Sequence, residues 1–218
     1  MRTSINYVIG SMAVSDVMMA AGIPFIVVTR FTRRWVLGQG PCKAVVYAQF
    51  VCGIASILSL TLVSLERYLH VAMATRGRAI SLRTTLKLLA GCWVLAFLFP
   101  VPVALAQGVK TLRCQGVDYE YCGVTWPDHF REDLYMGSLI GLFFVVPLAV
   151  MCVCYLKIVL VVRSSSSRVK DEGGGGGGGG GCCEGSSRTS GLQLRLVKMS
   201  ACIVTGFVFM WLPFFILR

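Results

Sequence analysis

Five long apolar runs constrain what this chain can fold into. Each run is long enough to cross the hydrocarbon core of a bilayer, which takes about 20 apolar residues in a helix. The runs lie near Ile5–Val28, Ala44–Val71, Leu86–Ala106, Leu134–Val162 and Leu192–Leu217. Lipid offers no hydrogen-bond partner to backbone polar groups, so each run is expected to be a helix. The sequence therefore predicts an all-α, polytopic bundle of transmembrane helices.

The composition excludes most classes of soluble protein. Of the 218 residues, 56% are hydrophobic and only 14% are charged, whereas soluble domains carry about 25% charge. The net charge of +11 does not indicate nucleic-acid binding, because the basic residues lie between the apolar runs and do not cluster on a soluble face. The ten cysteines are scattered and there are two histidines, so no metal site is expected. No nucleophile and base stand at a spacing that indicates an enzyme.

Charge and composition divide the loops between the two sides of the membrane. Most of the 21 lysines and arginines fall on the cytoplasmic side if the N-terminus is cytoplasmic, although the cluster from Arg30 to Arg34 falls on the other side. Segment 107–133 carries Cys114, Cys122 and five acidic residues, which is typical of an extracellular loop, where disulfides persist. Residues 163–191 include nine consecutive glycines and are expected to form a flexible cytoplasmic loop. No cleavable signal peptide is expected before the first run.

Charged residues within the apolar runs are candidates for function. Asp16 lies in the middle of the first run, and the run from Ser56 ends in Glu66, Arg67 and Tyr68. Charges at this depth are costly and usually serve a function. One alternative is a stop-transfer pair at a helix end. Another is a transporter or channel that uses Asp16 and Glu66 as a proton or ion relay, although no internal repeat favours it.

Several local motifs follow one another in a fixed order along the chain. They are Asn6 and Asp16 in their SMAVSD context, Trp35-Val36-Leu37-Gly38 before Cys42, Glu66-Arg67-Tyr68, Trp93, Pro147 with Tyr155, and Phe207 with Trp211-Leu212-Pro213. Together they resemble the rhodopsin-like (class A) G-protein-coupled receptors. The resemblance implies one seven-transmembrane receptor domain over residues 1–218, incomplete at both ends, with helices two to six present. A fragment or an incomplete gene model is the expected explanation.

The resemblance implies a conformational switch, not catalysis. At rest Glu66 would hold Arg67, with Tyr68 completing the motif. Activation would free Arg67 towards Tyr155 and a heterotrimeric G protein. At the foot of helix six, Gln193 stands where many family members have an acid that also holds Arg67, so raised basal activity is expected.

Other residues take roles in the same switch through the resemblance. The repacking core would consist of Ile57, Pro147 and Phe207. Trp211 would lie beneath the ligand, and Pro213 would kink helix six so that it swings outward on the cytoplasmic side. Asp16 and Ser56 match two members of the family's allosteric sodium pocket.

Gln49 and the extracellular loop indicate the class of ligand. Gln49 is expected to line the ligand pocket together with Trp211. Amine receptors place an aspartate at the position of Gln49, so an amine ligand would lose its ionic anchor. A long acidic loop, in which Val109–Trp126 is expected to form a hairpin over the pocket, favours a peptide receptor or a related orphan receptor. An amine or lipid receptor and a truncated, non-signalling membrane protein are the alternatives.

The resemblance also implies a disulfide between helix three and the extracellular loop. Cys42 is expected to pair with Cys122, and Cys114 is the alternative partner in the disulfide.

The expected binding partners of the protein are an extracellular peptide or small ligand, a heterotrimeric G protein, arrestin and membrane lipid, with no nucleic acid. The expected location is the plasma membrane, which the chain crosses several times.

Overall fold

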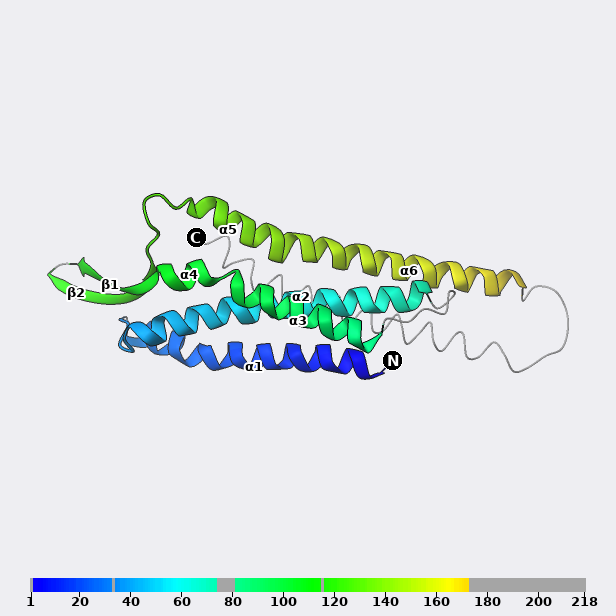
Figure 1. Cartoon of the computed structure of the whole chain (residues 1–218), viewed down its shortest axis with the longest axis horizontal. Helices are drawn as coiled ribbons and strands as arrows, with labels where there is room; N and C mark the ends of the chain where they lie inside the picture. The colour runs from blue at the N-terminus through cyan, green and yellow to red at the C-terminus, as the bar shows by residue number, and fades with distance from the viewer. Residues whose placement is uncertain (1, 33, 74–80, 115, 173–218) are drawn as a thin grey trace. The chain divides into compact units, whose positions relative to one another are not determined.

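The computed structural model describes residues 2–32, 34–73, 81–114 and 116–172, drawn as ribbons in Figure 1. In chain order the elements are α1 (Arg2–Thr32), α2 (Gln39–Met73), α3 (Leu82–Leu98), α4 (Val101–Ala106), β1 (Gln107–Cys114), β2 (Val117–Val124), α5 (Glu132–Ile140), the π-helix η1 (Gly141–Val145) and α6 (Val146–Glu172). The chain divides into two compact units, residues 1–63 with 81–147 and residues 64–80 with 148–218. The single domain expected from the sequence stays a prediction.

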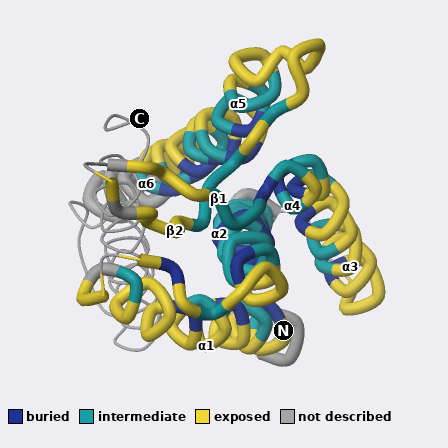
Figure 2. The backbone as a smooth tube through the Cα atoms, turned by 90° about the vertical axis from the view of Figure 1, so that its left-hand side faces the viewer, coloured by how far each residue is buried: buried dark blue, intermediate teal, exposed yellow. Residues whose placement is uncertain are grey.

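Four of the five predicted spans are confirmed as helices long and apolar enough to cross a membrane. They are Ile5–Thr29, Gln39–His70, Leu82–Ala106 and Glu132–Val161. Figure 2 shows that most of α1 is exposed, and its exposed residues include apolar ones such as Val17 and Phe31. Exposed apolar side chains suit a helix surrounded by lipid. The fifth predicted span, 192–217, lies outside the described residues.

Several predicted boundaries are shifted, among them the start of the second span, which lies at Gln39 and not at Ala44. Two of the shifts have a local cause. The third span begins at Leu82 and not at Leu86, because Ser81 caps the helix and its hydroxyl accepts a hydrogen bond from the backbone N–H of Thr84 at 3.4 Å. Helix α6 continues to Glu172, so the cytoplasmic loop does not begin at residue 163. After Pro147 no proline or glycine interrupts the sequence until Gly173.

Prolines interrupt the third span near its end and the fourth span near its middle. The third span is broken between Leu98 and Val101, where Pro100 occupies the N-cap of α4 and Pro102 lies in its first turn. In the fourth span, Pro147 directly follows the π-helix η1, in which the N–H of Val146 donates to the carbonyl oxygen of Gly141. Proline has no N–H to donate to the carbonyl four residues earlier, which disturbs the regular α-helical pattern at this point.

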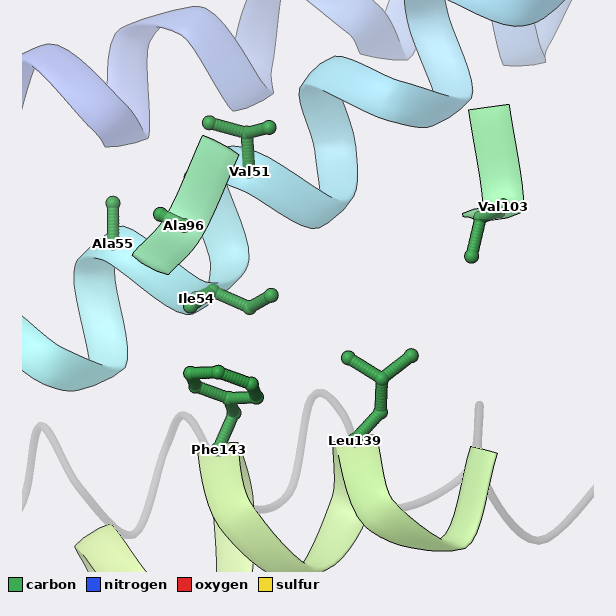
Figure 3. Packing of buried hydrophobic residues seen from close by; sticks show 7 residues of the cluster. All are labelled: Val51, Ile54, Ala55, Ala96, Val103, Leu139 and Phe143. Carbon is green, nitrogen blue, oxygen red and sulfur yellow. The ribbon is translucent and has the colours of Figure 1, made fainter. Parts of the chain in front are cut away.

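The core of the first unit lies where α2, α3, α4 and the α5–η1 segment meet. Figure 3 shows its seven buried residues: Val51, Ile54, Ala55, Ala96, Val103, Leu139 and Phe143. Leu139 and Phe143 point from α5 and η1 towards the other helices. The small side chains of Ala55 and Ala96, both fully buried, let the backbones approach closely. In the second unit, buried Met151, Cys154 and Ile158 share one face of α6, because they recur three and four residues apart.

Replacing Ala96 with leucine should destabilise the first unit. The larger side chain would have no space at a fully buried position, and overpacking of this kind costs about 1–3 kcal/mol. The measurement is the thermal unfolding midpoint of the detergent-solubilised protein. Ala90→Leu is the matched control, because Ala90 lies on the same helix and is exposed. Equal midpoints for the two variants would contradict the packing described for α3.

Candidate functional site

A disulfide-tethered β-hairpin forms the end of the first unit that the sequence assigns to the extracellular side. Strands β1 and β2 pair antiparallel, with Gln107 opposite Val124 and Cys114 opposite Val117. Gly116 in the turn has a φ of 82°, a left-handed conformation that glycine adopts at no steric cost. Cys42, near the start of α2, is bonded to Cys122 of β2. The predicted hairpin and the predicted Cys42–Cys122 pairing are therefore both confirmed, and Cys114 is not the partner.

Trp35 makes one contact to the hairpin and one within its own loop. The backbone N–H of Trp35 donates to the carbonyl oxygen of Glu120 at 2.6 Å, and the indole N–H of Trp35 donates to the carbonyl oxygen of Gly38 at 2.7 Å. Trp35 is only 4% exposed, so its ring is packed inside the protein. It fastens the loop between α1 and α2 to the outer edge of β2.

Gln107 supports the disulfide directly and was not identified from the sequence. Its amide nitrogen lies 3.0 Å from the sulfur of Cys122 and 3.8 Å from the sulfur of Cys42. The side chain is buried. No local pattern marks a glutamine at the start of a strand as a disulfide neighbour, because its partners lie far away in the sequence.

An aromatic cluster joins the end of the hairpin to α5. Trp126 stacks on Phe130 with ring centroids 4.7 Å apart, and both rings contact Tyr135 edge-on. The hydroxyl of Tyr135 donates to the carbonyl oxygen of Phe99 at 2.6 Å, at the break between α3 and α4. These contacts fix the loop that follows β2 against the helix that follows the loop.

Polar side chains join α1 to α2 and α3 inside the apolar region. Ser56 donates to a carboxylate oxygen of Asp16 at 3.2 Å, so the two residues assigned to a sodium pocket lie together. Trp93 of α3 donates through its indole N–H to the hydroxyl of Ser11 at 2.8 Å. Both hydrogen bonds join residues distant in sequence, and such contacts fix how neighbouring helices face one another in lipid.

Gln49 is held against α1. Its amide nitrogen donates to the backbone carbonyl oxygen of Met19 at 2.9 Å. Gly22 provides the space, because a Cβ there would collide with the same amide nitrogen. One N–H of the Gln49 amide is thus bonded to α1, which leaves the second N–H as a donor and Oε1 as an acceptor for further hydrogen bonds.

The second unit contains the Glu66-Arg67-Tyr68 motif and its neighbours on α6. The hydroxyl of Ser64 donates to the hydroxyl of Tyr155 at 2.7 Å. The ammonium of Lys157 lies 5.5 Å from the centre of the Tyr68 ring, within the range of a cation–π interaction. Glu66 is 1% exposed, which suits a functional carboxylate more than a stop-transfer charge. The resting pairing of Glu66 with Arg67 stays a prediction.

The remaining predicted residues are only partly described. Ile57 is half-buried on α2, and Pro147 is buried at the start of α6. Phe207, Trp211, Pro213 and Gln193 lie outside the described residues. The expected repacking core and the floor of the ligand pocket therefore stay predictions. Within residues 2–32, 34–73, 81–114 and 116–172, no group of three potential metal ligands comes together.

Comparison with known proteins places these features in one family. Residues 1–218 match the family model described as 7 transmembrane receptor (rhodopsin family). The somatostatin receptor type 2 of Mus musculus is 29% identical over 220 residues, covering 99% of this chain and 54% of the relative. The RYamide receptor of Drosophila melanogaster is 28% identical over 226 residues, covering 100% of this chain and 46% of the relative. The free fatty acid receptor 4 of Rattus norvegicus is 28% identical over 205 residues, covering 93% and 55%.

The chain spans about half the length of the curated relatives it matches. All three relatives are named as receptors, in agreement with the expectation that the chain is not an enzyme.

Cys122→Ser should lower surface expression and thermal stability more than Cys114→Ser does. Only the first substitution breaks the bond between α2 and the hairpin, and losing a native disulfide typically costs about 2–5 kcal/mol. Surface labelling of the intact protein and its unfolding midpoint are the measurements. A larger loss from Cys114→Ser would reverse the assignment of the disulfide.

Proposed function

The chain belongs to the seven-transmembrane receptor (rhodopsin) family, and from this premise we propose that an extracellular peptide controls its activation of a heterotrimeric G protein. The chain is a multi-pass protein of the plasma membrane. The observation that carries the proposal is helix α2, which runs without a break from Gln39 to Met73. Near its start it bears Cys42, the anchor of the extracellular hairpin, and near its end it bears Glu66, Arg67 and Tyr68.

The hairpin and Gln49 support a peptide ligand. The hairpin presents exposed Tyr119, Tyr121 and Glu120, a mixture of aromatic and acidic groups that can bind side chains of a peptide. Gln49 is neutral and one of its two amide N–H groups is bonded to α1. Its oxygen can accept a hydrogen bond from an amine but cannot form an ion pair with it. Relatives named for somatostatin and RYamide are consistent with this proposal. A fatty acid is the second candidate, because another relative is named for free fatty acids.

The proposed mechanism is a shift between two conformations. A ligand shifts such an equilibrium only by its difference in affinity for the two states. Arg67 would contact the G protein in the active state, with Tyr155 as its new neighbour. Ile57, Pro147 and Phe207 would repack, with Trp211 and Pro213 in helix six transmitting the change. Arrestin would bind the same activated cytoplasmic face.

Asp16 and Ser56 are proposed to hold an allosteric sodium ion. Their oxygens lie 3.2 Å apart, and a carboxylate with a hydroxyl is a donor set that suits a hard cation. When bound, the ion would supply a positive charge that offsets the charge of Asp16. The two residues orient each other through their own hydrogen bond.

Arg67→Ala should abolish or strongly weaken G-protein coupling while surface expression is unchanged. The loss should be about tenfold or more, because a hydrogen bond to a charged group contributes about 1.5–3 kcal/mol. Agonist-independent and, once a ligand is found, agonist-stimulated guanine-nucleotide exchange are the measurements, made with the complete protein. Arg83→Ala is the control, because Arg83 is an exposed basic residue in the first turn of α3. Unchanged exchange in Arg67→Ala would refute the assignment of the switch.

Gly22→Ala should weaken ligand binding with little change in stability. The added methyl group would displace the flexible end of Gln49 from Met19, and losing one neutral hydrogen bond should cost about two- to tenfold in affinity. Gly10→Ala on the same helix is the control, because a Cβ there meets nothing within 4 Å. The measurement is binding of the first peptide ligand identified. In a Gln49→Ala background the effect should vanish; a full effect there would show that Gly22 does not act through Gln49.

A further inference from the structure

We propose that Ser64 and Lys157 are positioning residues that restrain the switch, by holding Tyr155 and Tyr68 in the arrangement of this structure. The inference rests on the proposed function only for its consequence in signalling. The restraint itself is a property of the second unit, where both contacts join α2 to α6.

The first contact occupies the hydroxyl of Tyr155. The Ser64 hydroxyl donates to it at 2.7 Å, the preferred distance for an O–H···O hydrogen bond. Ser64 is 0% exposed, so water cannot readily replace the bond. A movement of Tyr155 away from Ser64 and towards Arg67 would break this bond, and a net intramolecular hydrogen bond stabilises the arrangement that contains it. The bond therefore opposes the movement proposed for activation.

The second contact acts on the neighbour of Arg67. Lys157 places its ammonium over the ring of Tyr68 at 5.5 Å. Tyr68 lies four residues after Ser64, so both side chains project from the same face of α2. Tyr155 and Lys157 are two residues apart on α6. A displacement of this part of α6 away from α2 would therefore break both contacts together.

Another buried serine on α2 shows that the contact of Ser64 is specific. Ser59 is 1% exposed, and its hydroxyl has no hydrogen-bond partner among the residues that the structure describes. Ser59 supplies packing alone, whereas Ser64 supplies packing and a directional bond to a second helix. Substitution by alanine removes a buried hydroxyl at either position. Comparing Ser59→Ala with Ser64→Ala therefore separates the loss of packing from the loss of the hydrogen bond to α6.

Cys154 provides a readout of the restraint that does not depend on a G protein. It is 4% exposed and precedes Tyr155, while Cys152 on the same helix is exposed. The experiment measures modification of both thiols by methyl methanethiosulfonate, by mass spectrometry of the detergent-solubilised full chain. Ser64→Ala should raise the rate at Cys154 relative to Cys152 by about two- to tenfold, the range expected for one net hydrogen bond.

Four comparisons decide whether the bond is responsible. Ser59→Ala should leave the ratio of the Cys154 rate to the Cys152 rate unchanged. Ser64→Thr keeps the hydroxyl and should therefore give the same ratio as the unsubstituted protein. Ser64→Ala should have no further effect in a Tyr155→Phe background, because the two substitutions remove the same bond. Lys157→Gln should raise the ratio, whereas Lys157→Arg should preserve it, since a guanidinium also binds an aromatic face. An unchanged ratio in Ser64→Ala, or an equal rise in Ser59→Ala, would overturn the restraint.

Guanine-nucleotide exchange without agonist separates this inference from the proposed function. If both are right, Ser64→Ala should raise basal exchange by the same factor as the Cys154 rate, because each reports the population of the released state. A raised Cys154 rate with unchanged exchange would support the restraint and count against G-protein activation by this switch. Unchanged Cys154 modification with raised exchange would overturn the restraint and leave the proposed function standing.

Discussion

The absence of water inside a bilayer is the constraint on which the rest of this structure depends. It strongly favours a helical backbone in the spans, because lipid offers no partner for the backbone polar groups. It also changes what distinguishes one helix arrangement from another. Leucine and isoleucine are as well solvated by lipid as by a neighbouring helix, so small residues and polar contacts carry more of the specificity. Ser56 with Asp16, Trp93 with Ser11, and Gln49 with Met19 are contacts of this kind.

The helical fold was predictable because the same constraint is visible in the sequence. A long apolar run in lipid forms a helix, and the four spans in the described part of the chain are helices. Their ends were less predictable, since they depend on local chemistry. Ser81 begins α3 earlier than hydropathy indicates, and α6 extends through a polar segment where nothing breaks a helix. The break at Pro100 lies inside a run that hydropathy treats as continuous.

The site was predictable only where a motif marks it. Glu66-Arg67-Tyr68, Asp16 with Ser56, and Cys42 with Cys122 all follow from the family resemblance, and the structure brings the last two pairs together. Gln107 and Ser64 were not assigned a role, because a neutral side chain gives no sign of a partner far away in the sequence. The hydrogen bond of Ser64 to Tyr155 depends on the placement of α6, which no local pattern contains.

The disulfide has a consequence for how the protein is made in the cell. Its two cysteines are 80 residues apart, and two membrane crossings lie between them, one by α2 and one by α3 with α4. An even number of crossings returns the chain to the side from which it departed. If either segment fails to insert, Cys42 and Cys122 are left in different compartments and cannot meet. The disulfide can therefore form only after both spans have been inserted correctly into the membrane. Its presence indicates that the topology of this part of the chain is correct.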